Sequence, residues 1–293
     1  HPLRMLDACR ATRVKPEPRT LVLLVSEHLV RISGNGGEGS LDTYHDRVRE
    51  ILVGRLSAED QSEHHRQLAL TLEDTPDADP QLLFTHFDAA NDRRKAGLYV
   101  LPAAERAVTN LAFDQAARLY QRAFALEAVA SDQTHEVRVR LADALANAGR
   151  SVESAGEYQT AAAGFSGTAA LELQRRAAEL LLRAGRLEEG CRILSTTLSA
   201  VGLRMPRSAF QAKLMALVNH FRLRLRGTRY RERFEHEIPA EELARLDTCW
   251  SATVLMITGG FRALPFATGF PLLALQVGEP YRVSLALAQL EIG

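Results

Sequence analysis

Small and apolar residues recur between residues 104 and 197 in a fixed order of spacings. One set has successive offsets of 3, 4, 5, 4 and 3, and a second set repeats them: Ala104, Ala107, Leu111, Ala116, Tyr120 and Ala123, then Ala178, Leu181, Gly185, Gly190, Leu194 and Thr197. Between the two sets, Ala142, Leu145, Gly149 and Tyr158 follow the same pattern. A repeated pattern of this kind indicates a unit of structure that recurs along the chain.

The repeat predicts helical hairpins. The turn positions Leu111, Gly149 and Gly185 are 38 and 36 residues apart, slightly more than the 34 residues of a tetratricopeptide unit. Small side chains let two helices approach closely, and glycine permits a tight turn. Because one hairpin cannot bury its apolar face alone, the hairpins must stack. We therefore expect a mainly α protein, with a tetratricopeptide-like α-solenoid over residues 57–293.

The first 56 residues have a different character and predict a winged-helix-like unit. Apolar segments on both sides of a glycine-rich stretch predict a β-hairpin with the glycines at its tip, and helical spacing follows from Asp46. The expected order is helix, helix, hairpin, helix, over Met5–Thr12, Leu21–His28, residues 29–44 around the stretch 34–39, and Asp46 onward.

Capping residues mark the helices that follow. Ser57 with Asp60 resembles a capping box, for a helix that continues to about Glu73. Asp79 before Pro80 predicts another helix start. Pro102 lies within an expected helix and should kink or split it.

The apolar stretch 250–278 contains one charged residue, Arg262. Pro265 and Pro271 also interrupt it, so neither half reaches the roughly 20 residues of a membrane-spanning helix. We interpret this stretch as buried solenoid helices, with Trp250 in the core, and residues 278–291 as a further helix that is cut short. No membrane partner is expected.

Composition excludes several kinds of protein. The 293 residues contain 36 basic and 36 acidic side chains, so no overall charge favours nucleic acid. Three cysteines lie far apart with no CxxC pair, which suits a reducing, cytoplasmic setting. The three lysines never follow glycine, which excludes a Walker A loop, and the HExxH and GxSxG motifs are absent. This chain is not expected to be an enzyme or to contain a catalytic residue.

The chain begins at His1 without a secretory leader. Together with the strong preference for arginine over lysine, this predicts a piece of a longer, bacterial protein.

Two motifs are interpreted as structural. Residues 34–39 form a GxGxxG match, but a dinucleotide site requires a helix directly after it, and residues 40–44 intervene. His45, His64, His65 and His86 lack the helical i, i+4 spacing of a metal site, so no metal is expected.

Two others remain open. His45 either occupies a helix start, capped by Thr43 or Asp46, or contacts a nucleotide phosphate. Arginines 222–233 either bind phosphates or form a solvated helix face and loop.

Ordered segments of the chain resemble large bacterial proteins in which a serine/threonine kinase is fused to a predicted ATPase of the signal-transduction (STAND) class and then to helical repeats. The resemblance covers roughly residue 20 to the end. It rests on YHDRVREIL (44–52), HHRQLALTLE (64–73), LAFDQAARLYQRA (111–123), LADALANAGR (141–150), LQRRAAELLLRAGRLEEG (173–190), LRLRG (223–227), LDTCWS (246–251) and GEPYRVSLAL (278–287).

The resemblance implies the end of a nucleotide-switch module followed by a repeat sensor. YHD at 44–46 is similar to the Met-His-Asp motif of related nucleotide-binding receptors, with Tyr44 in place of methionine. It implies that His45 contacts bound ADP and that Asp46 is its neighbouring cap. It also implies ATP or ADP in the parent chain, although this chain itself holds no cofactor.

We thus expect a non-catalytic regulatory region. Its partners would be the ATPase and kinase domains of the same chain and a protein or small molecule on the solenoid; nucleic acid is not expected. Two alternatives stay open. One is a DNA-binding transcriptional regulator that uses the winged helix, and the other is a free helical-repeat scaffold.

Overall fold

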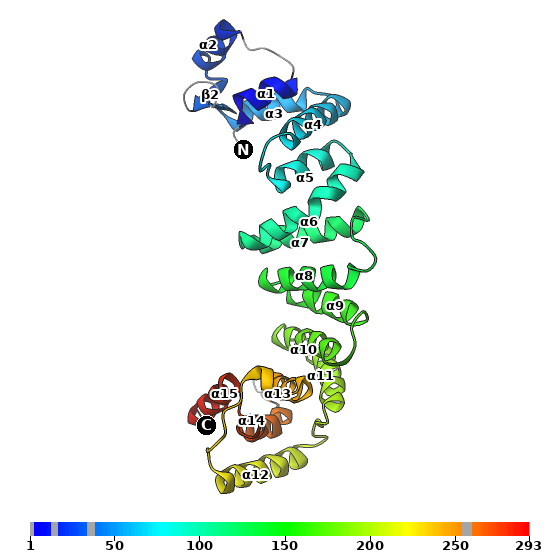
Figure 1. Cartoon of the computed structure of the whole chain (residues 1–293), viewed down its shortest axis with the longest axis vertical. Coiled ribbons are helices and arrows are strands. Elements are labelled where there is room, and N and C mark those ends of the chain that lie inside the picture. The colour runs from blue at the N-terminus through cyan, green and yellow to red at the C-terminus, as the bar shows by residue number, and fades with distance from the viewer. Residues whose placement is uncertain (1–2, 13–16, 34–38, 254–259, 293) are drawn as a thin grey trace. The chain divides into compact units, whose positions relative to one another are not determined.

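The computed structural model describes residues 3–12, 17–33, 39–253 and 260–292. The chain divides into two compact units, residues 1–130 and 131–293, and each is described by itself (Figure 1). The first contains β1 (Leu3–Arg4), α1 (Met5–Thr12), α2 (Pro18–Ser26), β2 (Val30–Ser33), β3 (Ser40–Thr43), α3 (Asp46–Gly54), α4 (Ala58–Glu73), α5 (Pro80–Ala89), α6 (Arg93–Thr109) and α7 (Phe113–Ala125).

The predicted order of two helices, a hairpin and a helix is confirmed at the N-terminus. β2 and β3 pair antiparallel, with Val30 opposite Thr43 and Ser33 opposite Ser40. The glycine-rich stretch that sequence places at the tip lies largely outside the described residues. One strand was not predicted: β1 pairs antiparallel with β3, which gives a three-stranded sheet of order β1-β3-β2.

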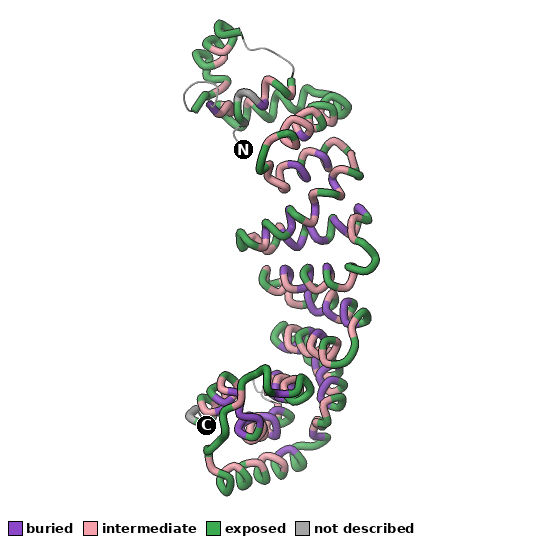
Figure 2. Tube along the Cα trace, viewed as in Figure 1, coloured by how far each residue is buried: buried purple, intermediate pink, exposed green. Residues whose placement is uncertain are grey.

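The helices α2 and α3 bury none of their residues among the described part of the chain. Val22, Leu23, Ile51 and Leu52 are 48–68% exposed, and Figure 2 shows both helices as largely exposed. An amphipathic helix normally buries its apolar face against another element. These two leave theirs uncovered.

Both predicted caps are confirmed. The Ser57 Oγ accepts a hydrogen bond from the Asp60 backbone N–H at 3.1 Å, and α4 ends at Glu73. The Asp79 carboxylate accepts from the Gln81 N–H at 2.9 Å at the start of α5. The expected split at Pro102 is wrong, because α6 is continuous through it. Pro102 and Leu98 are both exposed, so the helical hydrogen bond that proline cannot donate is lost at the protein surface, not in the core.

The repeat positions form one kind of turn. Leu111, Gly149 and Gly185 all have positive φ, at 58°, 79° and 77°. At Gly185, its N–H donates to Leu182 O at 3.1 Å and the Arg186 N–H donates to Leu181 O at 2.8 Å. This is the Schellman ending, in which a left-handed residue closes the helix. The residues at the other repeat positions are buried.

A further hairpin, which sequence analysis missed, has the same construction. Asn91 has φ 56° and the same pair of hydrogen bonds, from Asn91 N to Asp88 O and from Asp92 N to Phe87 O, each 3.0 Å. Phe84, Phe87, Ala96, Val100 and Ala103 stand around it at the repeat offsets, and all are buried. Helix α6 therefore belongs to two hairpins, with α5 before it and α7 after it.

The second unit continues the hairpins and then departs from them. α8 packs on α9, α9 on α10 and α10 on α11; α13 packs on α10 and α11, and both α12 and α15 pack on α14 (Figure 1). The bounds are α8 (Thr134–Asn147), α9 (Ser151–Ala162), α10 (Gly167–Arg183), α11 (Leu187–Ala200), α12 (Ala209–Arg226), α13 (Ala240–Thr253), α14 (Leu264–Val277) and α15 (Pro280–Ile292), with short 3-10 helices η2 (Glu235–Glu237) and η4 (Phe261–Ala263).

One apolar core joins these helices, from Ala142 to Ala286. Phe270, near the middle of α14, is fully buried, and its ring lies 5.0 Å from that of Trp250, which is partly buried against the core. The described parts of 250–278 are thus buried helices, as predicted. In the part of the chain that the structure describes, no helix is long and apolar enough to cross a bilayer.

Candidate functional site

His45 lies at the start of α3, and its side chain does not cap the helix. Its backbone is extended (φ −131°, ψ 139°), and it occupies the N-cap position without a side-chain hydrogen bond to the helix. The cap that sequence assigned to Thr43 or Asp46 is therefore wrong, since His45 itself is the N-cap residue. The His45 ring stands edge-on to Tyr44 at 4.8 Å, and Tyr44 stands edge-on to His28 at 5.0 Å.

Asp46 adds a negative charge beside His45. Its carboxylate lies 3.4 Å from the Arg49 guanidinium, and 84% of its side chain is exposed. His45 is also exposed. The structure thus places both predicted site residues side by side on the surface.

The histidines that sequence analysis set aside include one close pair. The Nδ1 atoms of His65 on α4 and His86 on α5 are 2.8 Å apart. Burial, followed by the charge of His65, lowers the pKa of His86 to about 4, and burial lowers the pKa of His65. No group of three or more potential metal ligands occurs among the described residues.

One hollow in the second unit has a volume of about 1210 Å³. One wall is a polar stripe on α11, formed by Glu188, Cys191, Arg192, Ser195 and Ser199. Their spacing of three or four residues places them on one face of the helix. The opposite face carries Ile193, Leu194 and Leu198, which are buried in the core, so packing of the apolar stripe directs the polar stripe into the hollow.

The second wall is the connector between α11 and α12, residues 201–208. Gly202, at φ 74°, closes α11, and the Leu203 N–H donates to Leu198 O at 2.8 Å. The Arg207 N–H donates to Gln211 Oε1 at 2.8 Å, and Ser208 caps α12. These bonds hold the connector in place without using the side chains of Arg204 and Arg207.

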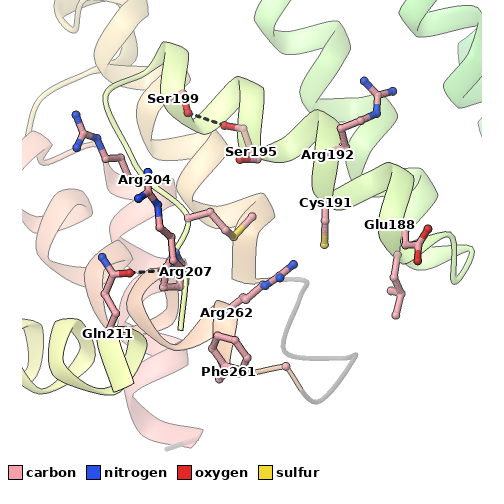
Figure 3. Close-up of a pocket in the computed structure, with 14 residues that line it drawn as sticks. Glu188, Cys191, Arg192, Ser195, Ser199, Arg204, Arg207, Gln211, Phe261 and Arg262 are labelled. Carbon is pink, nitrogen blue, oxygen red and sulfur yellow. Dashed lines mark hydrogen bonds between the residues drawn. The ribbon is translucent and has the colours of Figure 1, made fainter. Parts of the chain in front are cut away.

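Arg262 of η4 completes the hollow. Figure 3 shows its side chain extending into the space between the connector and α11. Within the described residues, none of the four arginines that line the hollow forms an ion pair, although neighbouring arginines do: Arg183 pairs with Glu179 at 2.7 Å and Arg186 with Glu189 at 3.5 Å. Guanidinium groups bind carboxylate and phosphate through paired hydrogen bonds, so this wall can bind anions.

In the arginine run from 222 to 233, some side chains bind backbone carbonyl oxygens and others are exposed. Arg226 donates to the carbonyl oxygens of Arg229 at 3.0 Å and Leu275 at 2.8 Å, and Arg233 donates to the carbonyl of Glu237 at 2.9 Å. Gly278 makes the loop possible, because a Cβ at that residue would lie 1.9 Å from the carbonyl oxygen of Arg231. Arg222 and Arg224 are exposed on α12.

No family model matches the chain, and no curated protein matches it in sequence. One solved structure is similar in part: a signal transduction ATPase with numerous domains (STAND) that has a tetratricopeptide repeat sensor, from Pyrococcus horikoshii. Sequence identity is 14%, and the match covers 100% of this chain and 46% of that chain with a TM-score of 0.33. This chain therefore spans about half the length of that protein. At this distance the likeness assigns neither fold nor function to this chain.

Proposed function

We propose that this chain is the regulatory region of a cytosolic signalling ATPase of the STAND class that is linked to a serine/threonine kinase. In this proposal residues 1–56 form the end of the nucleotide-switch module, and residues 57–293 form the repeat region that binds a protein or small molecule. The region is non-catalytic: it changes the balance between a closed and an open state of the parent. A ligand does so only through a difference in its affinity for the two states.

The observation that carries this proposal is the bare surface of α2 and α3. Apolar side chains such as Val22, Leu23, Ile51 and Leu52 are about half exposed or more, so covering each would gain about half or more of the roughly 1.5–3 kcal/mol that full burial is worth. A neighbouring domain that covers both helices would gain that free energy. The ATPase domain implied by the sequence resemblance is the partner that we propose for this surface.

His45 fits a sensor role in the same proposal. Its side chain is exposed, makes no capping bond and stands edge-on to the ring of Tyr44. An imidazole N–H can donate to a diphosphate oxygen, more strongly when the ring is protonated. We propose that His45 contacts ADP in the closed state and that Asp46 acts beside it.

The DNA-binding alternative is less well supported. Around the sheet and α3, arginines pair with carboxylates: Arg31 with Asp42 at 2.7 Å, Arg47 with Glu50 at 3.1 Å, and Arg49 with Asp46 at 3.4 Å. This pairing leaves little positive charge for a phosphate backbone.

The parent gene provides the first test. A reading frame that continues upstream of His1 into a GxxxxGK[ST] loop and kinase motifs is expected, whereas a start site within a few codons would refute the proposal. In the full-length protein, His45→Ala should weaken retention of ADP and raise basal activity. His64→Ala is the matched control, because His64 is also exposed but lies on α4. Equal effects of both changes would show that His45 has no specific role in ADP retention.

A further inference from the structure

A second hollow in unit 131–293, open to solvent on one side, has the size of a small-molecule site. Its volume is about 710 Å³, within the roughly 300–1,000 Å³ of small-molecule sites. The helices α12, α13 and α14 line it, and Arg204 of the connector lies in its wall as well as in that of the first hollow.

The lining combines an apolar part with positive charge. Met215, Phe266 and Leu272 contribute apolar surface, while Arg204, Arg222 and Arg245 line the hollow from three different elements. Gly269 allows α14 to come close to α12, since a Cβ there would lie 3.1 Å from the Asn219 amide nitrogen. The apolar part comes largely from α14, and the charged part comes from α12, α13 and the connector.

The charges in this hollow are not compensated. Arg226 is held by carbonyl oxygens, but Arg204, Arg222 and Arg245 form no ion pair within the described residues. No carboxylate occurs among the described residues that line the hollow, and residues 254–259 contain no acidic residue. Like charges gathered around an apolar space repel each other, and an anion between them removes that repulsion.

We propose that this hollow binds a small amphipathic oxyanion, a molecule with an apolar body and a phosphate or carboxylate head. The body packs against Met215, Phe266 and Leu272. The head accepts hydrogen bonds from Arg204, Arg222 and Arg245, whose guanidinium groups suit the planar arrangement of oxyanion oxygens. This assigns a ligand class to the proposed sensor region, and its meaning for regulation rests on that proposed function.

Cys249 is excluded from the chemistry of this site. Its thiol is buried, and burial raises the pKa of Cys249 to about 12 despite the nearby charge of Arg245. A protonated thiol is neither a nucleophile nor a metal ligand at neutral pH. The site therefore binds its ligand without a covalent step.

Titration calorimetry with the whole chain tests the proposal with three probes. Octyl phosphate has both head and body, inorganic phosphate has the head alone, and octanol has the body alone. We expect octyl phosphate to bind more tightly than either of the others. Equal affinity for octyl phosphate and inorganic phosphate would leave only a surface anion site, and no binding of octyl phosphate at millimolar concentration would overturn the proposal.

Two double variants distinguish the loss of arginines in this hollow from a general loss of positive charge. Arg222→Gln with Arg245→Gln should lower the affinity for octyl phosphate at least about tenfold, as expected for lost charged hydrogen bonds. The control, Arg224→Gln with Arg229→Gln, removes the same charge from exposed residues that line neither hollow and should change affinity less than about threefold. Equal losses would overturn the proposal.

A further titration with octanoate in place of octyl phosphate shows whether the site prefers a carboxylate or a phosphate head. If octyl phosphate binds but leaves the activity of the full-length parent unchanged, the binding site stands and the sensor function fails. If it does not bind, the site fails and the sensor function still stands on its own tests.

Discussion

Arg282 on α15 forms a two-pronged ion pair with Asp247 on α13: its Nε lies 2.7 Å from Oδ1 and its Nη2 lies 2.8 Å from Oδ2. The Arg282 side chain is only 13% exposed. Its Nη1 also donates to Glu279 at 3.1 Å, and the Glu279 carboxylate accepts the backbone N–H groups of Tyr281 and Arg282. One guanidinium thus connects the start of α15 to α13.

Arg282→Gln should therefore lower the unfolding free energy of the second unit by roughly 2–3 kcal/mol, because it leaves the partly buried carboxylate of Asp247 without its ion-pair partner. Arg282→Lys should recover only part of the loss, since an ammonium group cannot form both bonds. Urea unfolding followed by the fluorescence of Trp250, the single tryptophan, measures the change.

The control for this pair is Arg183→Gln. Arg183 pairs with Glu179 at 2.7 Å, but 59% of its side chain is exposed, so the loss should stay below about 1 kcal/mol. Equal losses from Arg183→Gln and Arg282→Gln would contradict the role given to Arg282.

The same chemical change should have opposite effects at two glycines. Gly185→Ala forces a side chain into the left-handed region and should lower the unfolding free energy by about 1 kcal/mol. Gly156→Ala lies within α9, with no atom within 4 Å of the added Cβ, and should raise it by about 0.5–1 kcal/mol. Trp250 fluorescence again provides the measurement. If both substitutions lower the unfolding free energy, the left-handed backbone at Gly185 is not the reason for the effect there.

Leu111 occupies the left-handed turn position that glycine occupies at 149 and 185, and its side chain is 73% exposed. Leu111→Gly should therefore stabilise the α6–α7 hairpin by about 0.5 kcal/mol, as relief of backbone strain exceeds the added chain entropy. Leu98→Gly, at an exposed residue inside α6, should destabilise it by about 1 kcal/mol. Hydrogen exchange of α6 and α7 reports both changes, and slower exchange in Leu98→Gly would refute the argument.

The His65–His86 pair predicts an acid-sensitive first unit. The folded pKa of His86 is about 4 against an ordinary 6.5, so below pH 6.5 the unfolded chain binds more protons. The unfolding free energy should consequently fall as the pH drops from about 6.5 toward about 4, by ~1–2 kcal/mol after allowance for solvent screening. Circular dichroism at 222 nm during urea unfolding at several pH values follows this loss.

His86→Gln should reduce that pH dependence, because it removes the group with the lowered pKa. His64→Gln is the control: His64 is exposed on the same helix as His65. If the unfolding free energy of His86→Gln depends on pH as it does in the unchanged protein, the histidine pair is not the cause of the acid sensitivity.

Local signals predicted most of the fold. The caps at Ser57 and Asp79, and the glycines at 149 and 185, act within a few residues, so sequence reveals them directly. Asn91 makes the same turn without glycine, and α6 is shared by two hairpins, so the α5–α6 hairpin escaped notice. β1 was missed because Leu3 pairs with Leu41, far along the chain, and two residues carry no periodic signal.

The candidate sites divide in the same way. His45 and Asp46 are adjacent in sequence, so a motif could identify them. The arginine-lined hollows join residues from 187 to 276, and their defining property, positive charge without a carboxylate partner, depends on the fold. Sequence showed the arginine run but not that Arg204 and Arg245 line the same hollow as Arg222.

The double membership of α6 has a consequence for local unfolding. Because α6 packs on both α5 and α7, opening it breaks two interfaces at once, whereas opening α7 breaks chiefly its interface with α6. Amide protons of Val100, Ala103 and Ala104, all fully buried, should therefore exchange with solvent more slowly than those of α7. Protease that cleaves only opened chain should likewise cut within α7 before α6.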